Sequence, residues 1–257
     1  MKTGISTACL YPMAVEKAFE TVATAKPQCC EVFFGSTTEL QDHFVNELAK
    51  RADFHGIDIV SVHPYSAAFE PLYFFSDYER RTDEGYELYK KYFNAMTILG
   101  AKYLIFHGEF KDGTLPNEIA FERMSHMCEI AKSFGVHMSQ ENVSRCKSRS
   151  PDFLLQMSQA IPDMTFTLDI KQAVRSDVDP FYLLDLLKER IVHLHISDHL
   201  PGSDCILPGH GNFDFNRLVK KLNQLDYNGG AVIELYSRNV TSLIDLQKSY
   251  EFIRKKF

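Results

Sequence analysis

Several short apolar runs in this chain end in a side chain that can bind a metal ion or carry a proton. In the run 191–196, His193 and His195 are two residues apart, so both imidazoles point to the same face of a strand. Three similar runs end in Glu141, Asp169 and Glu234. Carboxylates and imidazoles bind divalent ions and exchange protons with carbon acids. We therefore expect one site, assembled from positions far apart in the chain.

These runs belong to a regular alternation of apolar strands and amphipathic helices. The predicted strands cover residues 2–6, 29–34, 58–63, 102–107, 136–141, 164–169, 191–196 and 229–234. The segments between them have helical periodicity and helix-end signals, such as Gly56 and Gly100 after helices and Ser150-Pro151 before one. The connections 65–75 and 199–213 are expected to be long loops.

Eight strand–helix units over 257 residues predict a (β/α)8 TIM barrel, with residues 1–257 as a single domain. No linker or low-complexity segment divides the chain. A doubly wound open sheet is the alternative. It is disfavoured because no Gly-x-Gly-x-x-Gly follows a predicted strand, so no dinucleotide site is indicated.

The predicted barrel places its functional groups at the carboxyl ends of the strands. Six consecutive strands end in a potential ligand, in chain order His63, His107, Glu141, Asp169, His195 and Glu234. Converging carboxylates repel one another unless a cation lies between them, which predicts a divalent ion. Mixed oxygen and nitrogen donors suit Mn²⁺, Zn²⁺, Co²⁺ or Fe²⁺, and Mg²⁺ is compatible with them.

Composition excludes several other classes of function. The net charge is −6 and the longest basic run is Arg254–Lys256, which argues against a nucleic-acid partner. No apolar run approaches the ~18 residues of a membrane span. The six cysteines form no C-x-x-C pair and read as free thiols of a reducing compartment. We therefore expect a soluble cytoplasmic protein.

Seven short motifs lie at or just after these strand ends, in a fixed order. They are Val62-His-Pro-Tyr65, Ile105-Phe-His-Gly108, Gln140-Glu-Asn142, Thr167-Leu-Asp169, His195-Ile-Ser-Asp198, Leu207-Pro-Gly-His-Gly211 and Val232-Ile-Glu234. In this order they resemble the xylose isomerase-like barrels, the superfamily of sugar phosphate isomerases and epimerases and of endonuclease IV. Members are often dimers or tetramers, so a homo-oligomer is compatible with the resemblance.

The resemblance implies a role for each of the strand-end residues. Glu141, Asp169, His195 and Glu234 would form the shared metal quartet. His195 is selected over His193 because it matches the family's His-x-x-Asp element, and His193 is expected to be a hydrogen-bonded core residue. In the epimerase branch, the positions of Glu141 and Glu234 also exchange the proton of the substrate carbon.

Further residues at or after the strand ends are expected to contact the substrate. These are His63, His107, Lys171, Gln172 and His210. In the endonuclease branch, the positions of His63 and His107 hold a second metal ion. Arg145 is a further basic residue that could meet a substrate oxygen, and a solvated loop charge is its alternative. Glu31 is expected to hydrogen-bond inside the barrel.

Two departures from the endonuclease pattern disfavour cleavage at abasic sites. Gln172 stands where many relatives have histidine, and the Asp-x-His of the endonucleases is reduced here to Pro208-Gly-His210. Two of the three ligands of a third zinc ion are therefore missing.

The leading hypothesis is a metal-dependent isomerase or epimerase of a small sugar or sugar phosphate. A carboxylate would abstract the proton next to a carbonyl, and the ion would stabilise the enediolate as a Lewis acid. A dehydratase of the inosose type is the second hypothesis, and a barrel that binds a sugar or metal without catalysis is the third.

Overall fold

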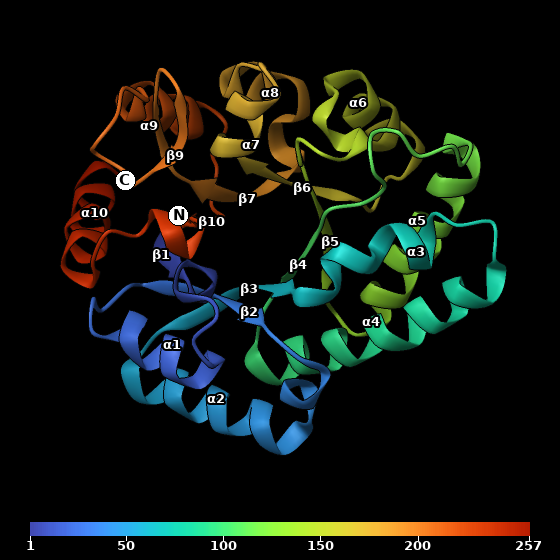
Figure 1. The fold of residues 1–257 in the computed structure, drawn as a ribbon, viewed down its shortest axis with the longest axis horizontal. Coiled ribbons are helices and arrows are strands. Elements are labelled where there is room, and N and C mark those ends of the chain that lie inside the picture. The colour runs from blue at the N-terminus through green and yellow to red at the C-terminus, as the bar shows by residue number, and fades with distance from the viewer.

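The protein folds as a closed barrel of eight parallel strands with helices on its outside (Figure 1). The computed structural model describes residues 1–257. The strands are β1 (Lys2–Ser6), β2 (Cys29–Phe34), β3 (Asp58–Pro64), β4 (Tyr103–Phe106), β5 (His137–Glu141), β6 (Thr165–Asp169), β7 (Ile191–Ile196) and β10 (Gly230–Ile233). Their order around the barrel is β1-β10-β7-β6-β5-β4-β3-β2, so each strand pairs with its neighbours in sequence among the barrel strands and β10 closes onto β1. The predicted single-domain (β/α)8 barrel is confirmed.

The helices lie around the barrel and are connected to it through short turns. They are α1 (Val15–Ala23), α2 (Asp42–His55), α3 (Glu70–Phe74), α4 (Glu79–Leu99), α5 (Asn117–Ser133), α6 (Pro151–Ala160), α7 (Ile170–Arg175), α8 (Pro180–Leu187), α9 (Phe215–Gln224) and α10 (Leu243–Lys256). Helices α2 and α4 end as predicted, at Gly56 and Gly100, whose φ angles of 65° and 73° are strained for residues with a side chain.

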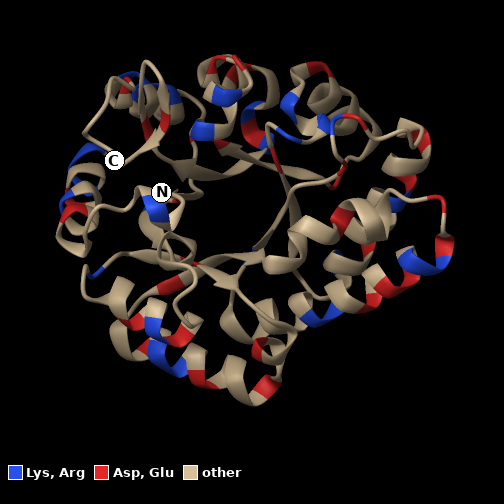
Figure 2. Ribbon diagram, viewed as in Figure 1, with Lys and Arg blue, Asp and Glu red and all other residues tan.

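One continuous apolar core of 63 buried residues fills the space between strands and helices. Aromatic rings join the two layers: the ring of Tyr89 on α4 lies 6.1 Å from that of Phe106 on β4. Figure 2 shows basic and acidic residues interspersed along the outer helices in this view. None of the helices combines the length and apolar composition that crossing a bilayer requires. All six cysteines are buried free thiols, as predicted.

Three connections contain more regular structure than the sequence predicted. The segment after β3 forms a 3₁₀ helix (Tyr65–Phe69) followed by α3, and the segment after β7 forms an antiparallel hairpin of β8 (Asp198–Leu200) and β9 (Ser203–Ile206). Helix α7, directly after β6, was not predicted, because its six residues are too few to show a helical period.

The segment between the hairpin and α9 is held by one buried carboxylate, that of Asp198. Asp198 accepts hydrogen bonds from the backbone N–H groups of Gly209, Gly211 and Phe213, at 2.9–3.0 Å. These bonds hold the connection to α9 against the end of β7.

Candidate active site and metal centre

A cavity of about 460 Å³ lies among residues at and just beyond the carboxyl ends of several strands. Six of the predicted site residues line it: His63, His107, Glu141, Lys171, Gln172 and Glu234. His210 is exposed and is not among the lining residues, so its contact with substrate stays a prediction. A TIM barrel collects its functional groups at this end because all its strands run the same way.

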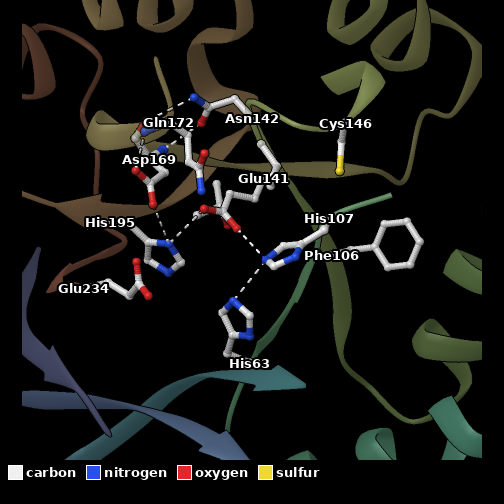
Figure 3. Close-up of polar contacts among 12 residues, drawn as sticks. His63, Phe106, His107, Glu141, Asn142, Cys146, Asp169, Gln172, His195 and Glu234 are labelled. Atoms are coloured by element: carbon white, nitrogen blue, oxygen red, sulfur yellow. Dashed lines mark hydrogen bonds and ion pairs between the residues drawn. The ribbon is translucent and has the colours of Figure 1, made fainter. Parts of the chain in front are cut away.

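Three of the four predicted metal ligands converge next to this cavity. One donor atom each of Glu141, Asp169 and His195 lies within 4.8 Å of the other two. His195 Nδ1 is 3.5 Å from Glu141 Oε1 and 3.4 Å from Asp169 Oδ2 (Figure 3). His195 Nδ1 is buried without a well-aligned hydrogen-bond partner, and Glu141 Oε2 lies 2.9 Å from His107 Nε2. Buried polar atoms normally have partners, so these donors fit a divalent ion.

The orientation of His195 is set from behind by Glu31, deep in the barrel. Glu31 Oε2 lies 3.0 Å from His195 Nε2 and 3.2 Å from His193 Nε2. The same carboxylate accepts hydrogen bonds from Ser6 Oγ at 3.0 Å and Ser61 Oγ at 2.8 Å. Because Nε2 of His195 is directed at Glu31, its Nδ1 faces the carboxylates of Glu141 and Asp169. The predicted internal roles of Glu31 and His193 are confirmed.

The charges around His195 favour a cation at that point. Burial opposes the charged imidazole, but the charge of Glu31 together with the nearby carboxylates of Asp169 and Glu141, which accept from the imidazole, outweighs it and raises the pKa of His195 well above its usual value. Burial likewise opposes the charged form of Glu31, yet His195 and His193 hold the pKa of Glu31 well below its usual range. The carboxylates around His195 would stabilise either a proton or a metal ion at its Nδ1 atom.

His63 and His107 form a second, differently arranged histidine pair. Arg145 Nη2 lies 2.9 Å from His107 Nδ1, and His107 Nε2 lies 3.1 Å from His63 Nε2. His63 Nδ1 is 3.3 Å from the carbonyl oxygen of Pro64. A guanidinium can only donate, so His107 accepts at Nδ1 and donates from Nε2, and His63 donates from Nδ1. His107 Nε2 also lies 2.9 Å from Glu141 Oε2, closer than His63 Nε2, so its proton faces the carboxylate as well as the second histidine (Figure 3).

The backbone around His107 is held by a buried carboxylate from α3. Glu70 accepts hydrogen bonds from the N–H groups of His107 and Gly108, at 2.8 and 2.7 Å, and from Tyr89 Oη at 2.6 Å. Burial raises the pKa of Glu70 to about 7 against the effect of these donors. The sequence offered no signal for this role, because Glu70 lies in the segment expected to be an irregular loop.

Lys171 is buried at the centre of the site, with 2% of its surface exposed. Its ammonium contacts both Asp169 and Glu234. Burial opposes its charge, but these carboxylates raise the pKa of Lys171 well above its usual value. In return, Lys171 is the main influence that overcomes burial and lowers the pKa of Glu234. The sequence predicted a substrate contact for Lys171 and did not anticipate this pairing.

Gln172 lines the cavity and also holds the neighbouring loop. Its Oε1 accepts hydrogen bonds from the backbone N–H and the hydroxyl of Ser144, at 3.1 and 2.9 Å. Tyr236 and Arg238 also line the cavity and were missed. Their position just after Glu234 in the sequence was the signal that could have identified them.

The comparisons with known proteins agree with this architecture. A family model described as xylose isomerase-like TIM barrel matches residues 16–256. The chain belongs to this family. An uncharacterized protein of Methanocaldococcus jannaschii is 24% identical over 99% of the chain and 89% of its own length.

Solved structures of relatives share the fold at low sequence identity. A D-tagatose 3-epimerase-like protein superposes with a TM-score of 0.81 at 23% identity, covering 100% of this chain and 99% of its own. An IolI protein with a bound zinc atom has a TM-score of 0.80 at 17% identity, with the same coverage. A probable 3-DHS dehydratase, AsbF from Bacillus anthracis, has a TM-score of 0.80 at 12% identity, covering 99% of both chains. These structures establish the fold.

Proposed function

We propose that this protein is an isomerase or epimerase of a small sugar or sugar phosphate that depends on one divalent metal ion. Two glutamates, Glu141 and Glu234, line one cavity beside a group of three metal donors, and this observation carries the proposal. Both carboxyl groups border the cavity in which a substrate would bind. The sugar epimerases and the zinc-containing protein among the structural relatives are consistent with it.

The chain supplies the two proton carriers and their alignment. Glu141 and Glu234 would remove the proton next to the carbonyl and return one to the same or the neighbouring carbon. Asp169 and His195 would hold the ion together with Glu141. When bound, the divalent ion supplies Lewis-acid stabilisation of the negative charge that develops on the substrate oxygens.

His63 and His107 would bind the substrate rather than a second ion. The two Nε2 atoms are 3.1 Å apart, and together with Glu141 they form a group of donors within 4.8 Å of one another, but Arg145 occupies the remaining nitrogen of His107. A metal ion at these nitrogens would have to displace the proton that Arg145 fixes on His107 Nε2. The pair also lines the cavity, where an imidazole can hydrogen-bond a sugar hydroxyl.

The test is proton exchange in D₂O, followed by NMR over a panel of ketoses, ketose phosphates and an inosose. We expect deuterium incorporation with formation of an isomer or epimer, and its loss in Glu141→Gln and Glu234→Gln. Near-normal turnover in either variant would overturn the assignment of that glutamate.

A dehydratase is the second candidate, because a probable 3-DHS dehydratase shares the fold. The same experiment separates the two reactions, since a dehydratase yields a product that has lost water. Tight binding of a sugar without any exchange would favour the non-catalytic barrel.

A further inference from the structure

The short helix α7 brings a lysine into the middle of the carboxylate cluster. Asp169 ends β6 and caps α7, and its Oδ1 accepts the backbone N–H of Gln172 at 2.9 Å. This tight turn directs the side chain of Lys171 back onto Asp169 and across to Glu234, which follows β10. The lysine thus bridges two strands that are not neighbours in the barrel, since β7 lies between them.

Lys171 is the lysine or arginine that pairs with the carboxylates of Asp169 and Glu234. The other cation of α7, Arg175, turns outward to Asp204 and to Tyr236 Oη, which lies 2.6 Å away. The ring of Tyr236 covers the ammonium of Lys171 at 5.8 Å. A buried ammonium is retained at such a site only where carboxylates compensate for its lost hydration.

The arrangement divides the carboxylates into two kinds. Glu141 and Asp169 have donor atoms within 4.8 Å of each other and of His195, and Glu234 is not part of that group. The ammonium of Lys171 contacts both Asp169 and Glu234, so Asp169 belongs both to the contacts of the lysine and to the group of three donors, whereas Glu234 belongs to the contacts of the lysine alone. The three carboxylates carry three negative charges, which a divalent ion together with one ammonium would balance.

We infer that Lys171 is a built-in cation that keeps Glu234 out of the ligand set of the metal ion. The ion is then held by Glu141, Asp169 and His195, and Glu234 is left as a proton carrier held in place by a lysine. This inference rests on the metal site of the proposed function. It changes the predicted quartet into three ligands and one lysine-held base, so the two glutamates are not equivalent.

The first test measures Mn²⁺ binding to the chelator-treated full-length protein by calorimetry and by EPR of free Mn²⁺. Lys171→Met removes a positive charge beside the ion and frees Glu234 as a ligand, so we expect binding to tighten about tenfold or more. Glu234→Gln should keep its affinity for Mn²⁺ within about threefold of wild type, whereas Asp169→Asn should weaken it about a hundredfold, as loss of a ligand does.

Two control variants separate charge from position. Lys171→Arg keeps the positive charge and should bind Mn²⁺ nearly as the wild type does. Arg175→Met removes a cation from the same helix that contacts none of the three carboxylates, and should also leave the Mn²⁺ affinity unchanged.

The second test measures thermal unfolding in EDTA and with saturating Mn²⁺. Without Lys171 the buried carboxylates lose their cation, so Lys171→Met should melt below wild type in EDTA, and Mn²⁺ should raise its melting temperature more than that of wild type. In the double variant Lys171→Met, Glu234→Gln, the decrease in melting temperature in EDTA should be smaller than in Lys171→Met, because one buried carboxylate charge has been removed.

Unchanged or weaker Mn²⁺ binding in Lys171→Met, or loss of Mn²⁺ in Glu234→Gln to the same extent as in Asp169→Asn, would overturn the inference. If Lys171→Met does not fold, the Glu234→Gln measurement alone decides. Failure of the proposed function has a different signature: Mn²⁺ bound as described, but no exchange with any substrate of the panel.

Discussion

The barrel contains two histidine pairs that differ in what lies behind them. His193 and His195 both contact Glu31, a carboxylate in the barrel interior. His107, in contrast, accepts from Arg145 at Nδ1, and its Nε2 lies 2.9 Å from Glu141 Oε2 and 3.1 Å from His63 Nε2. The first arrangement raises the pKa of His195, whereas burial and the neighbouring His107 lower the pKa of His63 to about 4.

The difference shows that residue type alone does not make a metal ligand. An anion behind an imidazole increases its basicity and directs the opposite nitrogen to a cation. A guanidinium behind an imidazole consumes one lone pair and leaves a neutral hydrogen-bond donor on the other side. The same side chain at different strand ends is therefore proposed to serve an ion in one case and a substrate in the other.

Replacing one histidine of each pair should give the largest contrast. His195→Gln removes a ligand, so we expect loss of Mn²⁺ binding and a fall in turnover of about a thousandfold or more. His63→Gln should keep Mn²⁺ and lose only about tenfold in kcat/KM, the size of one hydrogen bond to substrate. Calorimetry and steady-state kinetics provide the two readouts. Equal loss of Mn²⁺ binding in both variants would show that the two histidine pairs do not differ in metal binding.

Removing the carboxylate behind His195 should have an intermediate effect. In Glu31→Gln the imidazole becomes less basic and its ring loses its orientation, so Mn²⁺ affinity should fall about 10- to 100-fold. Ser61→Ala, which removes a different donor to Glu31, serves as the control and should stay within a few-fold. An Mn²⁺ affinity equal to wild type in Glu31→Gln would show that the carboxylate does not support the ligand.

Removing Arg145, which contacts His107, should allow the pair of His63 and His107 to bind a metal ion. In Arg145→Met, the Nδ1 atom of His107 loses its hydrogen bond from the guanidinium. After Zn²⁺ loading, we expect metal analysis to find more than the one ion per chain that we expect for the wild type. Arg149→Met removes an exposed arginine a few residues further on and should leave the count at one. Two ions per chain in the wild-type protein would refute the role assigned to Arg145.

The smallest effect concerns the pH dependence of stability. The folded-state pKa of His63 is about 4, below its ordinary value of 6.5, so between these pH values the unfolded chain binds a proton that the folded protein refuses. The contribution of His63 to the free energy of unfolding is therefore fully present above pH 6.5 and is lost as the pH falls toward 4. Between pH 7 and 5 in EDTA, wild type should lose about 2 kcal/mol more unfolding free energy than His63→Gln. Urea unfolding measures this difference, and parallel losses would show that His63 does not titrate in this way.

Much of the architecture was predictable because the signals are local. The period-2 strands, the glycine at the end of α2 and the Ser150-Pro151 start of α6 each depend on a few neighbouring residues. The positions of Glu141, Asp169 and His195 followed from the rule that strand ends meet at one face of a barrel. Helix α7 and the hairpin after β7 escaped prediction because their stability comes from Asp169 and Asp198, through contacts with specific backbone groups.

The sequence by itself determined the barrel, the face that carries the chemistry and the residues that gather there, because strand period and chain direction dictate them. Only the tertiary structure decided which partner each group has. Glu31 and His195 are 164 residues apart, and Lys171 and Glu234 are 63 apart. No local pattern encodes such pairs, since they depend on how the closed barrel brings distant strands across its interior. Those partners distinguish the histidine that we propose as a metal ligand from the one that we propose as a substrate contact.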